Sequence, residues 1–590
     1  MSLENKPPGL DYFELLKEAK TLPGRALAST LRVALLSTAS TQFLKPLLEV
    51  LFARQGVRAE VYEAPFGALL AEALDDKSGL YRFAPELVVV LPATQALRVP
   101  FAASDGGAAA FAERSAGEAA QLWDAVSARC PAWIVQATLA RPFERVFGGF
   151  EAKIGGGFDA AIAGINARVL EAARSRGRVL IADLDAVSSY LGRGRWFDEK
   201  VWIMGKVPCA PACLPHAARA VVDAWAASAG RTVKCVVVDL DNTLWGGVVG
   251  DDGPENLHIG DHGEGEAFAA FQRFLLALKR RGILLAVCSR NDRETALRAF
   301  RERPDMPLKE DDFAAFVADW NSKADGVAGI AAALSIGLDS LVFLDDDPFE
   351  RNLLRTAHPS VRVPELPEEP ADFVKALCEA NLFEAASFSA EDRARAEMYR
   401  VSAVRAASRA AFSTPEDYLR SLNMRIEAGR FDRARLPRIA QLIGRSNQFN
   451  LTTKRYHEDD CARWMDDAAA FPFWTSLKDD LGDSGLIGVA ILADRGGAVE
   501  IDEWLMSCRV LMRGVEDFMM NRAFAWARER GASVVRGEYR PTAKNAMVAE
   551  FYGRYGFRRT GESVGGAALW ELPVADYAPR PTCFAEETAP

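Results

Sequence analysis

Two aspartates one residue apart follow a short apolar run near the middle of the chain. Residues 236–238 (VVV) lead directly into Asp239, and Asp241 comes two residues later. Such a run is typical of a buried parallel strand, and open α/β sheets bind their ligands at the carboxyl ends of these strands. Residues two apart in a strand project from the same face. We therefore predict that Asp239 and Asp241 share a pocket, where one carboxylate could act as a nucleophile while the other handles protons.

Three later segments carry side chains that suit a phosphate group. Ser289 ends the apolar run ILLAVCS, and its hydroxyl could contact a phosphate oxygen. Lys323 stands just before a helix-like pattern, where its ammonium could neutralise phosphate charge. The run LVFL leads into Asp345, Asp346 and Asp347, which can complete an oxygen-ligand set for Mg²⁺. This set predicts phosphoryl transfer, a reaction that depends mainly on positioning and charge neutralisation.

In this order, the four segments resemble the motifs of the haloacid dehalogenase superfamily. The resemblance implies that Asp239 becomes aspartyl phosphate and that Asp241 is the general acid/base. The implied phosphate-binding residues are Ser289, Arg290, Asn291 and Lys323, and the implied Mg²⁺ ligands are Asp239, Asp241, Asp345 and Asp346. The first two motifs lie too close together for a large cap domain between them. We expect an open active site that admits a phosphorylated group on a large partner.

Composition indicates a multidomain cytoplasmic enzyme. The 590 residues are 49% hydrophobic and 26% charged, which argues against both disorder and a membrane protein. The net charge of −10 disfavours nucleic acid as a partner. The nine cysteines include no CxxC pair, which predicts reduced thiols, and Cys209 with Cys213 lacks the second pair that a zinc site needs. Neither a signal peptide nor a transmembrane run is expected.

Residues 1–30 are expected to form an extension, and residues 31–228 a doubly wound α/β domain, because short apolar runs alternate with helix-like segments. This domain resembles the SGNH-hydrolase-like domain of some longer phosphatases. Ser37 and His216 occupy the expected catalytic places, but no GDS sequence surrounds Ser37, and Cys213 stands where an aspartate is expected. Asn166 could be an oxyanion donor, although a place on a helix surface is favoured. A docking or structural role is therefore favoured over esterase activity.

The character of the chain changes again after residues 231–380, which carry the phosphatase motifs. Residues 381–435 are expected to form a helical connector, residues 436–575 a further domain, and residues 576–590 a tail. The run NQFNLTT gathers neutral hydrogen-bonding groups that could bind hydroxyls, amides or phosphates, or that could only tie down a loop. The candidate substrate-binding residues of this run are Asn447, Gln448, Asn450 and Thr452.

The segment that follows resembles a GNAT-type acyltransferase, in which backbone amides at a helix start bind the pyrophosphate of coenzyme A. A hairpin-like pair of strands leads to a helix that opens at Arg513 and Gly514. The family pattern falls on Arg509, Met512 and Gly514, so that Met512 replaces a glycine. Because that bulk hinders a pyrophosphate, a phosphopantetheine arm is the better candidate ligand. Arg509 and Arg513 are candidate phosphate-binding residues.

The order of DLDNTLW, NQFNLTT and SCRVLMRG is similar to that of the FkbH-like glyceryl transferase/phosphatases. The resemblance implies an SGNH-like sheet, a Rossmann-like haloacid dehalogenase domain with a minimal cap, and a C-terminal GNAT-like α+β domain. It implies a reaction in which a cysteine takes the glyceryl unit of 1,3-bisphosphoglycerate and the Mg²⁺ site removes the 3-phosphate. The phosphopantetheine arm of an acyl carrier protein then receives the glyceryl unit for polyketide-type biosynthesis.

Two cysteines compete for the acyl-carrying role. Cys508 precedes the expected substrate-binding turn, and Arg509 beside it could lower its pKa. Cys288 lies next to Ser289, but strand alternation points its side chain away from Ser289 into packing. Cys508 is therefore favoured. A scaffold that only binds carrier proteins and a stand-alone Mg²⁺ phosphatase remain alternatives, and the pathway, the cognate carrier, the oligomeric state and the order of the two steps stay open.

Overall fold

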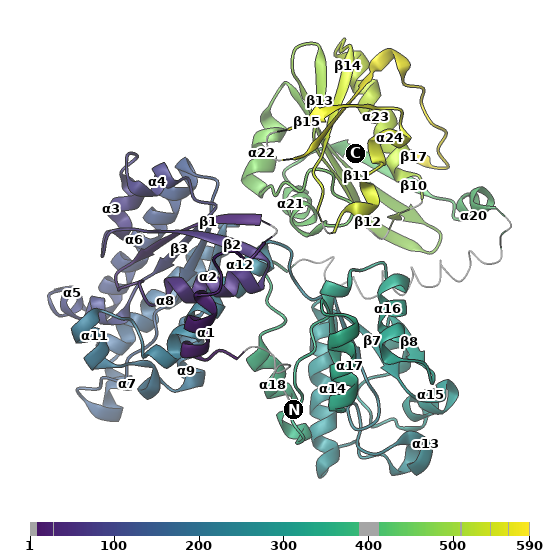
Figure 1. Ribbon diagram of the computed structural model, residues 1–590. Helices are drawn as coiled ribbons and strands as arrows, with labels where there is room; N and C mark the ends of the chain where they lie inside the picture. The colour runs from purple at the N-terminus through teal and green to yellow at the C-terminus, as the bar shows by residue number, and fades with distance from the viewer. Residues whose placement is uncertain are drawn as a thin grey trace. The chain divides into compact units, whose positions relative to one another are not determined.

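The computed structural model describes residues 9–27, 29–388, 412, 414–507, 510–511, 513–542, 544–563 and 566–588. The chain divides into two compact units, whose helices and strands are labelled in Figure 1. The first comprises Met1–Ala229 and Glu384–Ala386, and the second Gly230–Phe383 and Ser387–Pro590. Among the described residues, no helix is both long and apolar enough to cross a bilayer.

The first unit is built on a five-stranded parallel sheet, which confirms the predicted doubly wound arrangement. Its strands are β1 (Ser29–Ser37), β2 (Val57–Glu63), β3 (Leu87–Leu91), β4 (Trp133–Ala137) and β5 (Val179–Ala182). Their order is β2-β1-β3-β4-β5, so the chain winds first to one side of β1 and then to the other. Both faces of such a sheet are covered by the connecting helices.

Alternate residues of these strands pack on opposite helix layers. Helices α2 (Lys45–Arg54) and α12 (Leu214–Ser228) share a core with one face of the sheet. Helices α6 (Gly107–Arg129) and α8 (Phe158–Arg174) cover the other face. The shorter helices are α3 (Leu69–Leu74), α4 (Gly79–Phe83), α5 (Arg98–Ala102), α7 (Glu151–Ile154), α9 (Leu184–Leu191), α10 (Arg193–Trp196) and α11 (Glu199–Gly205).

The expected N-terminal extension is partly built into this domain. Residues Tyr12–Ala19 form α1, capped by Asp11, and Leu15 of this helix is fully buried in the same core as α2 and α12. Strand β1 already begins at Ser29. The amphipathic spacing of α1 accounts for the difference, since its apolar stripe needs a surface to cover.

The second unit contains a four-stranded parallel sheet with the order β8-β7-β6-β9. Its strands are β6 (Cys235–Val238), β7 (Leu284–Ser289), β8 (Ala315–Ala318) and β9 (Leu341–Leu344). Helices α14 (Glu264–Arg280), α15 (Arg293–Glu302) and α18 (Phe373–Ala380) cover one face, and α16 (Lys323–Ala333) and α17 (Pro348–Ala357) cover the other. Between β6 and α14 lie only a short helix, α13 (Val249–Asp252), and a 3₁₀ turn, Pro254–Asn256, so this segment forms no cap domain.

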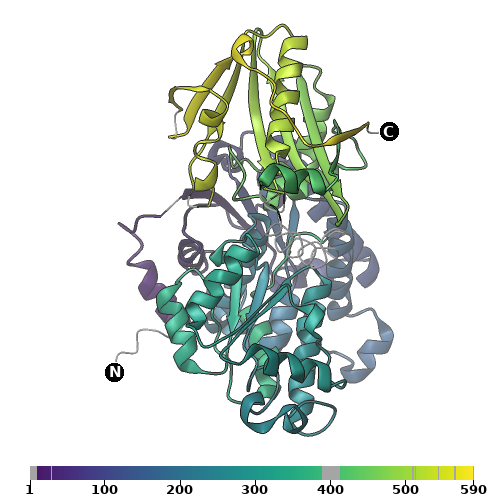
Figure 2. The ribbon, with the colours of Figure 1, turned by 90° about the vertical axis from the view of Figure 1, so that its right-hand side faces the viewer.

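An eight-stranded mixed sheet follows in the same unit, with the order β15-β16-β14-β13-β12-β11-β10-β17. Helix α23 (Val515–Glu529) packs on one face of this sheet (Figure 2), and α21 (Leu436–Arg445) and α22 (Glu458–Asp466) pack on the other. The strands are β10 (Arg425–Arg430), β11 (Ala470–Asp479), β12 (Gly482–Asp494), β13 (Ala498–Met506), β14 (Val534–Tyr539), β15 (Arg558–Glu562), β16 (Ala568–Pro573) and β17 (Ala585–Thr588).

Two boundaries of this last domain differ from the expected ones. The expected connector of residues 381–435 contains α20 (Pro415–Ser421) and strand β10, while residues 389–411 and 413 lie outside the described part. The expected tail of residues 576–590 contains β17, which pairs in parallel with β10. Ile426 and Ala428 alternate with more exposed neighbours along β10, and this period of two is the strand signal that the charged, Ala-rich stretch before it obscured.

The polar groups expected at an esterase site in the first domain are engaged within the fold. Ser37 Oγ donates to the Leu91 carbonyl at 2.8 Å and accepts from the Ala39 amide at 2.9 Å. No hydrogen bond joins Ser37 to His216 in the part of the chain that the structure describes. The serine proton is therefore directed at a carbonyl and not at a base.

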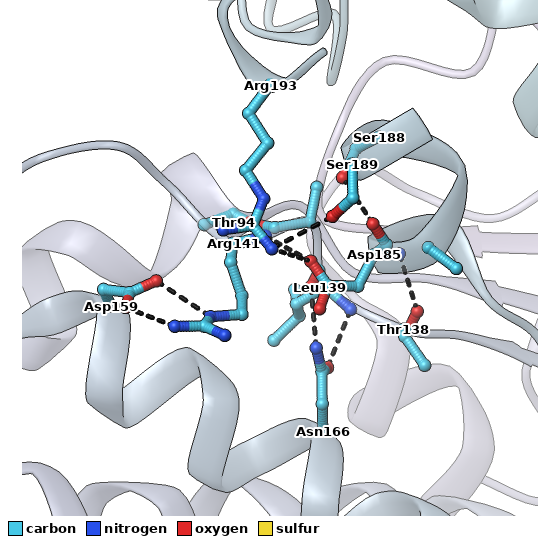
Figure 3. A network of polar contacts seen from close by, with 12 residues as sticks. Thr94, Thr138, Leu139, Arg141, Asp159, Asn166, Asp185, Ser188, Ser189 and Arg193 are labelled. Atoms are coloured by element: carbon cyan, nitrogen blue, oxygen red, sulfur yellow. Dashed lines mark hydrogen bonds and ion pairs between the residues drawn. The ribbon is translucent and has the colours of Figure 1, made fainter. Parts of the chain in front are cut away.

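The remaining oxyanion candidate, Asn166, is buried in α8 and does not lie on the helix surface. Its amide accepts from the Leu139 backbone N–H at 2.9 Å and donates to the Leu139 carbonyl at 2.8 Å (Figure 3). Both ends of the side chain thus tie down the segment after β4. This leaves no aligned Ser-His pair and no free oxyanion donor at Asn166.

We expect Ser37→Ala to leave ester hydrolysis unchanged and to lower stability by about 1 to 2 kcal/mol, because the Ala39 amide and the Leu91 carbonyl lose a partner. Hydrolysis of 4-nitrophenyl acetate and urea unfolding would measure the two effects. A serine-dependent esterase rate that disappears in the variant, with stability preserved, would restore the catalytic interpretation.

Candidate active site

The acids, the hydroxyl and the lysine singled out by the sequence meet at one edge of the four-stranded sheet. Asp239 follows β6, Ser289 ends β7, and Asp345 follows β9. Lys323 is the first residue of α16, which follows β8. Because all four strands are parallel, their carboxyl ends lie along the same edge. Each predicted motif therefore contributes from a different strand or from the helix that follows it.

Lys323 lies between two carboxylates. Its Nζ is 2.9 Å from Asp239 Oδ2 and 2.7 Å from Asp345 Oδ2, and all three side chains are buried. Burial alone would lower the lysine pKa, but the attraction of Asp239 and Asp345 outweighs it and raises the pKa of Lys323. The ammonium is therefore held charged beside the expected nucleophile.

The structure groups Asp239, Asp345 and Asp346 so that one oxygen of each lies within 4.8 Å of the others. Asp239 Oδ1 is buried and has no hydrogen-bond partner. Burial, and then the nearby charge of Asp239, raise the pKa of Asp345, and burial also raises that of Asp346. An all-oxygen set with an unsatisfied oxygen and excess negative charge fits Mg²⁺, which would keep the carboxylates ionised.

Two side chains that the sequence analysis did not single out position these acids. Thr243 Oγ1 donates to Asp346 Oδ1 at 3.0 Å and accepts from the Asp346 backbone amide at 3.1 Å. Arg351 is buried and donates to the Asp345 and Asp346 carbonyls at 2.8 and 2.7 Å. Thr243 lies inside the DLDNTLW motif, and its position there could have indicated a role in the site. Arg351 lies on α17, and only the fold shows its role.

Asp241 does not contribute a carboxylate oxygen to this acidic group. Its Oδ1 accepts from Trp245 Nε1 at 2.9 Å and from the Val249 amide at 3.0 Å. Its Oδ2 accepts from Asn291 Nδ2 at 2.8 Å. The structure thus places Asp241 beside the site and separate from the three candidate metal ligands, an arrangement that suits proton transfer better than coordination.

The residues after β7 link the site to its surroundings. Asn291 is buried and also donates to Ser289 Oγ at 3.2 Å, so it joins Ser289 to Asp241. Arg290 is directed to Glu350, with Nη1 and Oε1 3.0 Å apart. Of the predicted phosphate-binding residues, Ser289, Asn291 and Lys323 are thus connected through hydrogen bonds or ion pairs to the two aspartates of the first motif.

Cys288 packs on the opposite side of its strand, as the alternation of β7 predicts. Its Sγ donates to the Lys323 carbonyl at 3.6 Å, and a Cβ built at Gly326 would lie only 2.7 Å from that sulfur. Burial raises the pKa of Cys288 to about 12. A thiol in this environment is a poor nucleophile, because the thiolate is the reactive form.

The NQFNLTT residues lie on the loop between α21 and α22, where several of them stabilise the loop itself. Asn450 Oδ1 accepts from the Thr452 and Thr453 amides at 3.2 and 2.6 Å. Thr452 Oγ1 donates to Glu503 Oε2 at 2.7 Å, and burial raises the pKa of fully buried Glu503 to about 7. Glu503 was not among the predicted residues, although an acid directly before the apolar residues that end strand β13 indicates a buried partner.

The remaining candidate substrate-binding residues of the C-terminal domain have different partners. Asn447 accepts from Arg455, and Gln448 is half-buried on the same loop. Arg513 is directed to buried Asp479, with Nη1 and Oδ2 3.2 Å apart. Cys508 and Arg509 lie outside the described residues. Asn447 and Arg513 are thus each held by a partner within the C-terminal domain.

Comparison with curated proteins gives no match. Solved acetyltransferase structures match about a quarter of this chain. The ribosomal-protein-S18-alanine N-acetyltransferase from Escherichia coli is 15% identical, over 25% of this chain and 94% of its own, with a TM-score of 0.21. The spermidine N-acetyltransferase from Vibrio cholerae in complex with CoA and spermine is also 15% identical, over 26% and 98%, with a TM-score of 0.21. Similarity at this level decides nothing about activity.

The rest of the chain has a more informative likeness. The family described as FkbH, N-terminal domain, matches residues 32–226. The crystal structure of the N-terminal part of BF1531 from Bacteroides fragilis, which contains a phosphatase domain and is complexed with Mg, is 34% identical to this chain. The alignment covers 64% of this chain and 100% of that one, with a TM-score of 0.60. The chain therefore belongs to the FkbH-like family.

Proposed function

We propose that this protein is a Mg²⁺-dependent phosphatase and glyceryl transferase that uses 1,3-bisphosphoglycerate and loads an acyl carrier protein. The observation that carries the phosphatase half is the buried contact of Lys323 with both Asp239 and Asp345, beside an unsatisfied oxygen of Asp239. A carboxylate can attack a phosphate only where the negative charge of both is offset. This site has the components for that task.

The residues divide the phosphoryl chemistry between them. An Asp239 oxygen attacks the phosphorus of the 3-phosphate, and the bond to the C3 oxygen breaks as Asp241 donates a proton to that oxygen. Asp241 then takes a proton from water, which attacks the phosphorus and releases inorganic phosphate from Asp239. Lys323 offsets the charge of the phosphoryl oxygens, and Ser289 binds one of them. The hydrogen bond of Asn291 to Asp241 Oδ2, 2.8 Å long, orients that carboxyl.

Mg²⁺ would be held by Asp239, Asp345 and Asp346, whose oxygens already converge. When bound, it neutralises charge on the phosphate and the acids. Thr243 and Arg351 fix the two acids after β9 through the contacts described above, and so prepare the ligand set before any ion binds.

The acyl half is assigned to the C-terminal domain, for which we propose a GNAT-like fold. Strands β13 and β14 pair in parallel over residues 498–501 and 534–537, although β13 continues to Met506. Their separation beyond these residues supports a groove for a pantetheine arm. Cys508 thiolate would attack the acyl carbon of 1,3-bisphosphoglycerate and displace phosphate. A pantetheine thiolate would then attack the thioester and release Cys508.

We expect Asp239→Asn to abolish phosphate release from 3-phosphoglycerate, because an amide cannot form the aspartyl phosphate. The matched control is Asp347→Asn, since Asp347 is exposed, caps α17 through the Phe349 amide at 2.8 Å, and lies outside the acidic group. Asparagine caps helices as well as aspartate does. A phosphate-release assay should show normal rates for the control. Full activity of Asp239→Asn would eliminate the assigned nucleophile.

Thr243→Val should raise the Mg²⁺ concentration for half-maximal activity by about tenfold, because Asp346 loses its side-chain donor and the acceptor for its amide. Titration of phosphatase activity with Mg²⁺ measures the shift. Excess Mg²⁺ should restore the rate of Thr243→Val and leave Asp239→Asn inactive. An unchanged Mg²⁺ titration would show that Thr243 does not position a metal ligand.

Cys508→Ala should release phosphate from 3-phosphoglycerate normally and fail to gain glyceryl mass from 1,3-bisphosphoglycerate, because a methyl group cannot displace the acyl phosphate. Cys288→Ala should still gain that mass and lose on the order of 1 kcal/mol of stability through a small cavity. Intact-protein mass spectrometry with and without holo carrier protein tests both. The reverse pattern would move the thiol chemistry to the phosphatase site.

A further inference from the structure

The N-terminal domain exposes a cluster of large apolar side chains. Phe143 is 74% exposed, Val146 89% and Phe147 62%, on the segment that follows β4. Ile203 and Met204 on α11 are 70% and 78% exposed. Single exposed apolar residues are ordinary, but a group of them on segments that ion pairs join is typical of a binding surface. We define these five residues together with Val99 of α5 as the apolar patch.

Ion pairs hold the segments of the apolar patch together. Arg98 of α5 contacts Glu144, and its Nη1 and Nη2 each donate to Glu199 at 2.8 Å. Val99 and Phe143 are the sequence neighbours of Arg98 and Glu144. Ile203 lies four residues after Glu199 and therefore on the same face of α11. Arg98, Glu144 and Glu199 thus join the three segments that carry the apolar side chains.

A polar network fixes the base of the exposed segment (Figure 3). Arg141 binds Asp159 with two bonds, of 2.9 and 2.5 Å, and the Arg141 amide donates to Asp185 at 3.0 Å. Asn166 clamps both backbone groups of Leu139 in the same region. The apolar residues that follow are therefore presented from an anchored backbone, which lowers the entropy cost of binding a partner.

The surface around the apolar patch is cationic, although the chain as a whole has a net charge of −10. Residues 141–154 and 193–206 contain seven arginines and lysines, of which Arg141 and Arg193 pair with Asp159 and Asp185, and four carboxylates. Two of those carboxylates, Glu144 and Glu199, already pair with Arg98. Within the described chain no carboxylate pairs with the exposed cations Arg145, Lys153, Arg195, Lys200 and Lys206. This surface therefore complements an acidic partner.

We propose that the apolar patch and its cations form the docking surface for an acidic protein domain that presents an apolar helix face. The inference rests on the proposed function, because this partner is the carrier protein that accepts the glyceryl unit. The apolar side chains supply contact area, and the cations without a carboxylate partner select for negative charge. The N-terminal domain would then serve to bind the carrier protein, and this role does not require Ser37.

The first experiment compares two acceptors of the glyceryl unit in the full-length enzyme. The acceptors are a purified acidic holo acyl carrier protein and free pantetheine. Phe147→Ser combined with Met204→Ser should lower kcat/KM for the carrier on the order of tenfold through KM, and leave transfer to pantetheine unchanged. Phe13→Ser is the matched control, because Phe13 on α1 is 68% exposed and lies apart from the apolar patch in sequence.

A second pair of variants tests charge. Lys153→Glu combined with Lys200→Glu should weaken carrier binding in isothermal titration calorimetry on the order of tenfold, and the remaining affinity should depend less on salt. Lys77→Glu is the control, because Lys77 is exposed and has no carboxylate partner in the described chain. Phosphate release from 3-phosphoglycerate should be normal in all of these variants.

The outcomes separate this inference from the proposed function. Wild-type binding of the carrier that neither set of substitutions weakens would overturn the docking surface, as would no binding at all. Self-association that the apolar substitutions abolish, measured by analytical ultracentrifugation, would overturn it by assigning the surface to a second copy of the chain. Failure of the wild type to acylate pantetheine would overturn the transferase activity, whereas patch-dependent carrier binding would still support docking.

Discussion

The candidate active site depends on the placement of three carboxylates and one ammonium in a single cluster, in which Asp239, Asp345 and Lys323 are buried and Asp346 is half-buried. Like charges this close repel strongly in a region of low dielectric, so Asp239 and Asp345 can lie side by side only because Lys323 contacts both. The parallel sheet makes this arrangement possible. Strands β6 and β9 are neighbours, so their carboxyl ends bring two acids together, and α16 delivers the lysine from the helix layer above. One unsatisfied Asp239 oxygen then remains available for chemistry.

Much of this site was predictable because its signals are local. An apolar run followed by an acid indicates a strand end, and parallel strands must gather their ends at one edge. The orientation of Asp241 was not predictable, since it depends on Trp245, Val249 and Asn291, which bind it from separate segments. Arg351 was missed for the same reason. Arg351 lies on α17 and binds the carbonyls of the loop that precedes this helix. An arginine in a helical sequence gives no indication of such a contact.

The edges of the C-terminal sheet were the least predictable part of the fold. Strand β17 is recognisable only through its partner β10, which lies more than a hundred residues earlier in the chain. A strand of only four residues is too short to show a hydrophobic pattern, and the sequence does not indicate a partner so far away in the chain. The N-terminal domain shows the complementary case. Its strand order suits a ligand-binding edge and Ser37 follows the first strand, yet the Ser37 hydroxyl is hydrogen-bonded to backbone groups, so the fold alone does not supply an activated serine.

The contact between Gly326 and Cys288 sets how closely α16 approaches the sheet. With no side chain at residue 326, the helix rests almost directly on the sulfur, and Lys323 begins the same helix one turn earlier. Because close packing makes the helix rigid, the distance between α16 and β7 determines where the ammonium of Lys323 lies. A methyl group at this position would force the sulfur or the helix to move, and a shift of a few tenths of an ångström would be passed on to the contacts of Lys323 with both acids. The ion pairs of Lys323 thus depend on the packing of Gly326 against Cys288, whose side chain lies on the side of β7 opposite Ser289.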